Sequence, residues 1–344
     1  MAQPGHPHAT IVDVANRAGV AISSASAALN GRPGVSDTTR DRVRKIADEL
    51  GYVPSIRGRS LSAKRAFSVG LTVQRDFSVL EADPFFGAFI GGIEETLEPN
   101  GYALSLQIAG TAEASLDRQV KLADARRVDG MFLNEIREND ARIDALTTRS
   151  VPAVGINPAD DFPFPAVRQD GSEAIHELVQ RMVELGHTRI AHVTGLGAYV
   201  HTAERLRAWT LAIQDAGLSA DNVVEGDFTY EGGARAADRL LSSDNKPTAV
   251  ICANDLTALG LMNRAAELGY VVPDDLSVAG FDGISMGAYI RPTLTSIRTD
   301  PRALGRESAR LLLEVIDGET PADVDIAPAT VIFRDSLGPV ALSV

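Results

Sequence analysis

Two consecutive stretches near the N-terminus decide the first part of the fold: Ile11-Val-Asp-Val-Ala-Asn-Arg-Ala-Gly-Val20 and Ala21-Ile-Ser-Ser-Ala-Ser-Ala-Ala-Leu-Asn30. Thr10 and Asp13 form a capping-box pattern, which predicts that a helix begins at Ile11. Gly19 permits a tight turn, and the small Ala15 lets a second helix, from about Ile22, cross the first closely. The stretch predicts a helix-turn-helix, and a plain three-helix bundle remains the alternative.

Two further regions follow this head. Ser36 predicts the start of a third helix over 37–50, which Gly51 closes. A short basic segment comes next, and from Phe67 onward the sequence changes character. We therefore expect a head over residues 1–53, a hinge over 54–65 and a core over 66–335.

The core alternates apolar strands with amphipathic helices, which predicts parallel sheets with right-handed crossovers. The strand candidates are 68–73, 103–108, 130–133, 153–156, 189–194, 248–252 and 276–281. The helix candidates are 86–97, 171–185, 203–216, 230–241, 256–268 and 302–316. The strands are too many for one open sheet, so we expect an α/β core of two doubly wound parallel-sheet lobes.

Charge is divided unevenly along the chain, whose 344 residues carry a net charge of −13. Residues 1–65 contain ten Lys/Arg and five Asp/Glu, whereas the remainder contains 23 and 41. A basic head on an acidic body is typical of a protein that places only its head on nucleic acid. An accidental bias in a short segment would look the same, so charge alone does not decide the point.

Several classes of protein are disfavoured by composition. Cys252 is the single cysteine, so an intramolecular disulfide and a cysteine-based zinc site are excluded. No apolar run reaches the ~18–20 residues that cross a bilayer, and the N-terminus lacks the pattern of a secretory signal. We expect a cytoplasmic chain with no membrane contact, metal or cofactor.

Residues 10–71 closely resemble the LacI/GalR family of repressors. The resemblance rests on the helix-turn-helix stretch, on Val-Ser-Asp-Thr-Thr-Arg (35–40) and on Leu-Gly-Tyr-Val-Pro (50–54). It implies an all-α helix-turn-helix head, a hinge helix and a periplasmic-binding-protein-like core, and a repressor controlled by a small-molecule effector. The implied first lobe covers about 66–165 and 293–325, and the second covers about 166–292 and 326–335.

The resemblance also implies which residues contact double-stranded DNA. These are Thr10, Ile22, Ser23, Ser24, Ala27 and Asn30 in the head, and Ser55, Arg57, Gly58, Arg59 and Leu61 in the hinge. Ala27 departs from the Arg or His that the family usually carries, and its methyl group suits a thymine contact. Ala21 replaces the usual capping serine, so the second helix is expected to start at Ser23 or to fray.

The hinge is too short to be a stable helix alone, so we expect it to order when two copies pair over DNA. By the resemblance, Leu61 wedges between base pairs from the minor groove, with Arg57 and Arg59 at phosphates or groove edges. A solvated linker with a stray leucine is the alternative. Residues 331–344 show no leucine heptad, so we expect a homodimer on a pseudo-palindromic operator.

In doubly wound folds, ligands bind beyond the carboxyl ends of the strands. Asn157 follows a strand candidate there, and the resemblance adds the effector contacts Arg205, Phe228, Asn254 and Asp282 and the pocket wall of Phe85 and Phe86. We expect Arg205 to be the only clear cation of the pocket, which favours a sugar or nucleoside without charge. Asp255 is expected to cap a helix, and Asp170 to support a crossover between lobes.

Two other functions were weighed. Gly283-Ile-Ser-Met-Gly287 matches the nucleophile elbow of a hydrolase, but no histidine follows His201 to complete the triad order. Gly195-Leu-Gly197 follows a strand, yet Val200 stands at the third glycine position of a dinucleotide fingerprint. A periplasmic-type solute-binding protein is the alternative that the core alone would allow, and the basic head argues against it.

Overall fold

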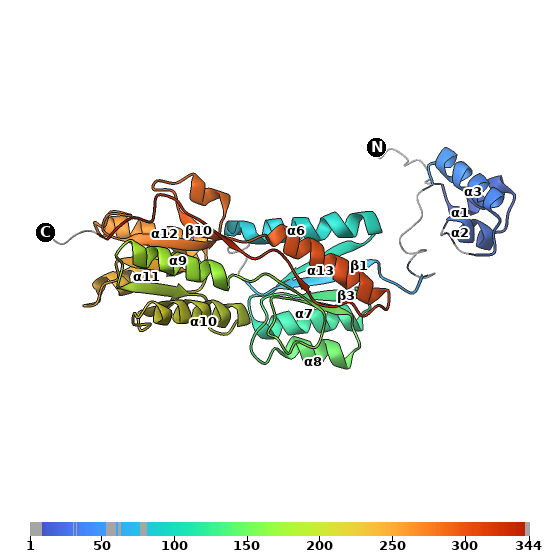
Figure 1. Cartoon of the computed structure of the whole chain (residues 1–344). Helices are drawn as coiled ribbons and strands as arrows, with labels where there is room; N and C mark the ends of the chain where they lie inside the picture. The colour runs from blue at the N-terminus through green and yellow to red at the C-terminus, as the bar shows by residue number, and fades with distance from the viewer. Residues whose placement is uncertain are drawn as a thin grey trace, which may run out of the picture. The chain divides into compact units, whose positions relative to one another are not determined.

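The computed structural model describes residues 9–29, 31, 33–52, 60, 63–75 and 81–340. The chain forms two compact units, Met1–Ala66 and Phe67–Val344 (Figure 1). The predictions for Asn30, Ser55, Arg57, Gly58, Arg59 and Leu61 lie outside the described residues, so they stay predictions.

The first unit contains the predicted helix-turn-helix. Its helices are α1 (Ile11–Ala18), α2 (Ile22–Leu29) and α3 (Asp37–Leu50). Thr10 and Asp13 complete the capping box of α1, and Gly19 ends it in the left-handed region at φ 63°. The helices pack through small or branched side chains that are almost fully buried, Val14, Ala15, Ala18, Ala25, Ala28, Val43 and Ala47. These alanines let the helices cross closely, as the sequence predicted.

The expected late start of α2 is wrong. The helix begins at Ile22, and the Ala25 amide donates to the Ala21 carbonyl at 2.9 Å. An N-terminal residue needs only its backbone carbonyl to accept the first helical hydrogen bond. Alanine at position 21 therefore changes the capping of α2 without moving its start.

The second unit is built on two six-stranded sheets, in the orders β11-β5-β4-β3-β1-β2 and β12-β10-β9-β8-β6-β7. The first contains β1 (Ser68–Val73), β2 (Ala103–Ile108), β3 (Gly130–Leu133), β4 (Ala153–Ile156), β5 (Ala166–Arg168) and β11 (Val324–Asp325). The second contains β6 (Ile190–Thr194), β7 (Val223–Glu225), β8 (Ala249–Cys252), β9 (Ser277–Asp282), β10 (Thr295–Arg298) and β12 (Thr330–Ile332). Every pair is parallel except β10 with β12, which confirms the two predicted lobes.

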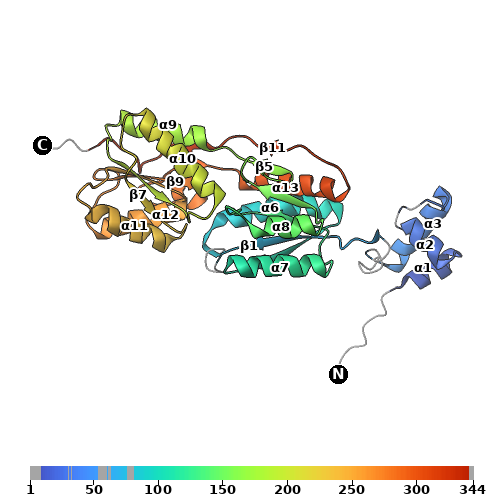
Figure 2. The same ribbon diagram turned by 90° about the horizontal axis from the view of Figure 1, so that it is seen from below.

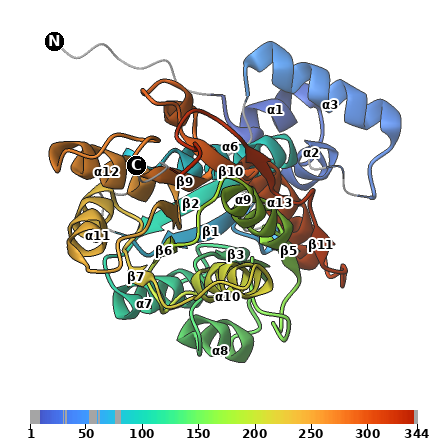
Figure 3. The same cartoon turned by 60° about the vertical axis from the view of Figure 1, so that its left-hand side comes forward.

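Helices cover both faces of each sheet (Figures 1 and 2). On the first sheet, α6 (Pro84–Leu97) and α13 (Pro301–Ile316) share one apolar cluster, while α7 (Ala112–Asp124) and α8 (Ala141–Thr148) share another. On the second, α11 (Tyr230–Ser242) and α12 (Asp255–Glu267) oppose α9 (Ser172–Glu184) and α10 (Val200–Asp215) (Figure 3). The second unit also contains two short 3-10 helices, η1 (Glu98–Asn100) and η2 (Ser285–Ala288).

The predicted lobe boundaries need a correction. β5 pairs with β4, so residues 166–168 belong to the first lobe rather than the second. β10 pairs with β9 and β12, so the segment from 293 begins in the second lobe and not in the first. The predicted boundaries differ because the chain passes to the other lobe only after β5 and after β10 have paired, and it passes once more between β11 and β12.

Candidate functional site

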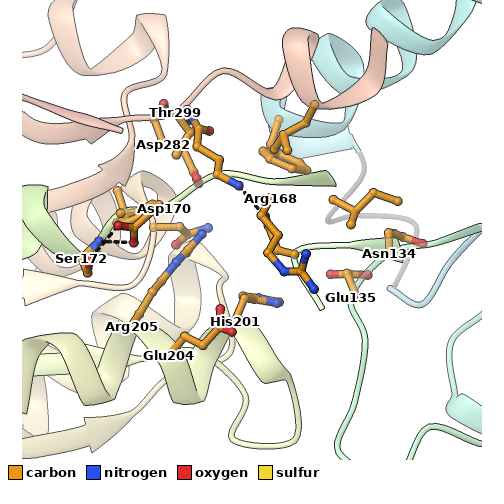
Figure 4. A pocket seen from close by; sticks show the side chains of 18 of the residues that line it. Asn134, Glu135, Arg168, Asp170, Ser172, His201, Glu204, Arg205, Asp282 and Thr299 are labelled. Atoms are coloured by element: carbon orange, nitrogen blue, oxygen red, sulfur yellow. Dashed lines mark hydrogen bonds between the residues drawn. The ribbon is translucent and has the colours of Figure 1, made fainter. Parts of the chain in front are cut away.

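A cavity of about 760 Å³ lies between the two lobes of the second unit (Figure 4). The first lobe lines it with residues that follow β1, β3 and β4 and with the start of α6. The second lobe contributes the ends of β9 and of the strand preceding α12, together with one face of α10. The carboxyl ends of parallel strands therefore meet here, as the doubly wound fold requires.

All seven residues predicted to contact an effector line this cavity: Phe85, Phe86, Asn157, Arg205, Phe228, Asn254 and Asp282. Asn157, Phe228 and Asp282 have positive φ angles of 46°, 65° and 104°. Such backbone conformations are costly for non-glycine residues and cluster at functional sites. Lining the cavity does not by itself assign these residues a contact with a ligand.

Arg205 is held by a hydrogen bond and by an aromatic ring. One guanidinium nitrogen donates to the Ala253 carbonyl at 2.7 Å, and the guanidinium carbon lies 3.7 Å from the centre of the Phe281 ring. Burial raises the pKa of the nearby Asp282 carboxyl, and the positive charge of Arg205 acts against that shift. Arg205 and Asp282 thus place a hydrogen-bond donor and an acceptor on the second lobe's side of the cavity.

The sequence predicted that Asp255 caps α12, but Asn254 is the cap. Asn254 caps α12, because its amide oxygen accepts from the Thr257 amide at 3.0 Å, and its amide nitrogen donates to the Phe228 carbonyl at 2.9 Å. Asp255 is not the cap: its carboxylate accepts from the Ser296 hydroxyl at 2.5 Å and from the Ile284 amide at 2.7 Å. The asparagine fits better as a cap because it donates to the neighbouring loop as well.

One side chain joins the three segments in which the chain passes between the lobes: after β5, after β10 and between β11 and β12. Gln169 donates to the Ala327 carbonyl and accepts from the Asp300 amide, both at 2.9 Å, so it links all three crossovers. Asp170 accepts from the amide and hydroxyl of Ser172 at the start of α9. It therefore supports a crossover as predicted, although it also lines the cavity.

The prediction that Arg205 is the only clear cation is wrong. Arg75, Arg168 and Arg207 also line the cavity, and so do the acidic residues Asp83, Glu135, Asp160, Glu204 and Asp325. Arg75 and Glu135 were detectable by the strand-end rule, since they come directly after β1 and β3. Arg168 ends β5, a strand that was not predicted, and Glu204 lies on a helix whose orientation only packing sets, so neither was identified from the sequence.

Carboxylates dominate the charge at the cavity. Arg168 donates to Asp323 at 2.5 Å and to the Ala159 carbonyl at 3.2 Å, and Arg75 donates to Glu135 at 2.5 Å. At the mouth, loss of solvation and the negative charge of Asp160 raise the pKa of Glu204 to about 7. Burial likewise raises the pKa of Asp83. Acidic groups thus outnumber the guanidinium groups, most of which already have partners.

The head presents the predicted DNA-contacting face of α2. Ile22 is 50% exposed and Ser23 is exposed, whereas Ser24 and Ala27 are half-buried next to the buried Ala25 and Ala28. Thr10 lies at the start of α1, where its side chain is occupied in the capping box. Their contacts with DNA stay predictions.

Two further properties concern the described residues. None of their helices has both the length and the apolar character needed to cross a bilayer. Within the same part of the chain, no group of three or more histidine, cysteine or acidic side chains is arranged to hold a metal ion.

Family models match both units of the chain. One described as "Bacterial regulatory proteins, lacI family" matches residues 10–55, and one described as "Periplasmic binding protein-like domain" matches residues 179–337. Catabolite control protein A of Priestia megaterium is 30% identical over 335 residues, 95% of this chain and 98% of that protein. The HTH-type transcriptional repressor CytR of Escherichia coli is 33% identical over 314 residues, 90% of this chain and 91% of that protein.

Solved structures of regulators are also similar to nearly the whole chain. The lac repressor dimer bound to operator and the anti-inducer ONPF has a TM-score of 0.82 at 27% identity, covering 95% of this chain and 98% of that one. The complex of the transcriptional regulator CelR with cellobiose has a TM-score of 0.74 at 30% identity, with coverages of 95% and 99%. Because these proteins are regulators that match both units, the hydrolase and solute-binding alternatives are set aside. The chain therefore belongs to the lacI family of bacterial regulatory proteins.

Proposed function

We propose that this chain is a homodimeric transcriptional repressor whose binding to a pseudo-palindromic operator is controlled by an uncharged, polyhydroxylated effector such as a sugar or nucleoside. The observation that carries the proposal is the cavity between the lobes, which gathers all seven predicted effector residues in one unit of a chain whose other unit is a helix-turn-helix. Relatives that carry both units include repressors.

The chemistry of the cavity supports a neutral ligand with several hydroxyl groups. A carboxylate such as Asp282 and a guanidinium such as Arg205 can each make paired hydrogen bonds to neighbouring hydroxyls. Phe85 and Phe86 provide an apolar wall against which the face of a sugar ring can pack. An anionic ligand would meet mainly carboxylates, since Arg75 and Arg168 are paired with Glu135 and Asp323.

The proposed switch is a shift between lobe arrangements. A ligand that contacts both lobes favours their closed arrangement, and the crossovers linked by Gln169 are the segments that bend. In a dimer, such closure changes the spacing of the two heads and hinges, and so the fit to an operator with two half-sites. Ala27 would give each half-site a thymine contact where relatives with Arg read guanine.

The test begins with operator selection from a random duplex library, using the full chain at moderate salt. We expect a palindromic site with no guanine selected opposite position 27. A thermal-shift screen of sugars and nucleosides, with sugar phosphates and sugar acids as the anionic set, then identifies the effector. We expect an uncharged compound to raise the melting temperature and to change operator affinity.

The variant Arg205→Ala separates effector binding from DNA binding. It removes the guanidinium that we propose binds the effector's hydroxyl groups, so we expect loss of the effector's thermal shift while operator affinity persists. Arg181→Ala removes an exposed arginine of the same lobe and is the control. A normal effector response in Arg205→Ala, or stabilisation by the anionic set alone, would contradict the proposal.

A further inference from the structure

The two lobes contact each other directly at one end of the cavity. At this aromatic end, Arg75 and Glu135 of the first lobe and Phe228 of the second line the cavity, and Tyr199 of the second lobe contacts Arg75 from outside the lining. Arg75 follows β1 and Glu135 follows β3, while Tyr199 precedes α10 and Phe228 lies between β7 and α11. In Figure 4, Asn134 and Glu135 lie across the cavity from Asp170 and Asp282.

Arg75 joins the two lobes at this end. Its Nε donates to Glu135 Oε1 at 2.5 Å, and both side chains are only 9% exposed. Its guanidinium carbon lies 4.7 Å from the centre of the Phe228 ring and 5.1 Å from that of the Tyr199 ring. A guanidinium at these distances is attracted to the negative face of each ring, and more strongly where water is excluded.

The loop that carries Glu135 is held in place from behind. Glu135 has a φ of 47°, a conformation that persists only where neighbouring contacts impose it. Arg142 donates to the Asn134 and Glu135 carbonyls at 2.9 and 3.2 Å, and it is itself paired with the buried Asp140. The carboxylate is therefore presented to Arg75 by a fixed backbone.

Backbone groups add to the contact between lobes. The Val200 amide donates to the Ile136 carbonyl at 2.9 Å, and the Glu138 amide donates to the Ala198 carbonyl at 3.3 Å. The Tyr199 hydroxyl donates to the Gln74 carbonyl at 3.4 Å. These bonds place the aromatic rings of the second lobe against the first lobe's strand ends.

The Phe228 ring is enclosed by groups of the protein itself. It is 4% exposed. A Cβ atom at Gly195 would lie 1.8 Å from its Cζ, so the ring rests on that glycine. The centres of the His201 and Phe228 rings lie 5.5 Å apart. Arg75 of the first lobe also covers the Phe228 ring. The side chains around Phe228 thus occupy the space that a stacking ligand would need.

We propose that the Arg75 side chain fills the aromatic end of the cavity, in the position that a ligand ring stacked on Phe228 would otherwise take. In this position Arg75 also holds the two lobes together. Arg75 is then a specificity-determining residue. The effector uses the part of the cavity near Asp83, Arg205 and Asp282 and does not stack on Phe228. The proposal rests on the proposed function only in treating this cavity as the effector site.

The test measures lobe closure in the full chain with no effector added. Fluorophores on Glu113→Cys and Gln214→Cys, which are exposed on α7 and α10, report the distance between lobes, and the buried Cys252 is protected from labelling. Arg75→Ala should raise the ratio of open to closed molecules roughly tenfold or more. Low millimolar guanidinium chloride should restore closure by filling the vacated position, whereas equal sodium chloride should not.

The control is Arg149→Ala, which removes an arginine paired at 2.8 Å with Asp124 inside the first lobe and should leave closure unchanged. Wild-type closure in Arg75→Ala, or opening that guanidinium does not reverse better than sodium chloride, would overturn the proposal. If Arg75→Ala does not fold, Glu135→Gln keeps the side-chain volume and should open the lobes in the same direction. Closure unchanged in that variant would overturn the proposal equally. Because closure is measured without effector or operator, this failure is distinguishable from failure of the proposed function.

Discussion

At the scale of single residues, Asp255 shows how a buried carboxylate joins separate elements. It starts α12 and accepts hydrogen bonds from Ser296 on β10 and from the Ile284 amide before η2. The side chain is almost fully buried, and burial is the main cause that raises its pKa to about 7, with the hydrogen bonds acting against the shift. Protonation of the Asp255 carboxyl is therefore coupled to folding.

Asp255→Asn should flatten the dependence of stability on pH. The folded pKa is raised above its value of 3.8, so the contribution is present at low pH and is lost as pH rises through about 7. Relative to the asparagine variant, the wild type should lose about 2 to 3 kcal/mol of unfolding free energy between pH 5 and pH 8. Urea titrations measure this, with the exposed Asp274→Asn as control. Parallel curves for wild type and Asp255→Asn would refute the coupling.

At the scale of elements, α6 and α13 approach until their backbones touch. A Cβ atom at Gly92 would lie 2.0 Å from the Arg302 carbonyl oxygen, and one at Gly305 would lie 2.1 Å from the Phe89 carbonyl oxygen. The two glycines face each other's helix, so the close crossing needs both. This pair of helices sets the position of Phe85 and Phe86 at the cavity wall.

Neighbouring glycines of α6 provide a matched test. Gly92→Ala forces the helices apart, and we expect a loss of about 1 to 3 kcal/mol in unfolding free energy. Gly91→Ala meets nothing within 4 Å, so helix propensity alone should stabilise the chain by up to about 1 kcal/mol. Chemical denaturation of both variants checks this. Equal effects at the two positions would mean that the close approach does not matter.

At the scale of the whole molecule, the two units have separate cores. The apolar cluster of the head involves residues from Ile11 to Tyr52, and the clusters of the second unit begin at Phe67. Each unit therefore buries its own apolar surface. The positive charge belongs to the head and the negative charge to the other unit, so phosphate attraction is confined to one end of the chain.

The fragment 67–344 should consequently fold alone and keep the effector's thermal shift, because every cavity-lining residue lies within it. It should lose operator binding, since the head is missing. Calorimetric melting with and without effector measures the first property, and a duplex-binding titration at moderate salt measures the second. Specific operator binding by the fragment would contradict the separation of roles.

The sequence by itself determined the helix-turn-helix, the two lobes and most strand positions. Caps, small residues at the crossing and alternating apolar runs act locally, so they can be read without the fold. The edge strands β7, β11 and β12 and the polar strand β10 were missed because they lack the continuous apolar run that identified the equally short β3, β4 and β8. The helices α7 and α8 were missed as well.

Only the tertiary structure decided which side chains meet at the cavity and how they pair. The strand-end rule placed Asn157 and Asp282 at one edge, but it could not show that Arg75 reaches Glu135 and the rings of the opposite lobe. Nor could it assign β5 and β10 to their lobes. Strand pairing and inter-lobe contacts join residues that are far apart in the sequence. A local sequence pattern carries no information about which distant residue forms the contact.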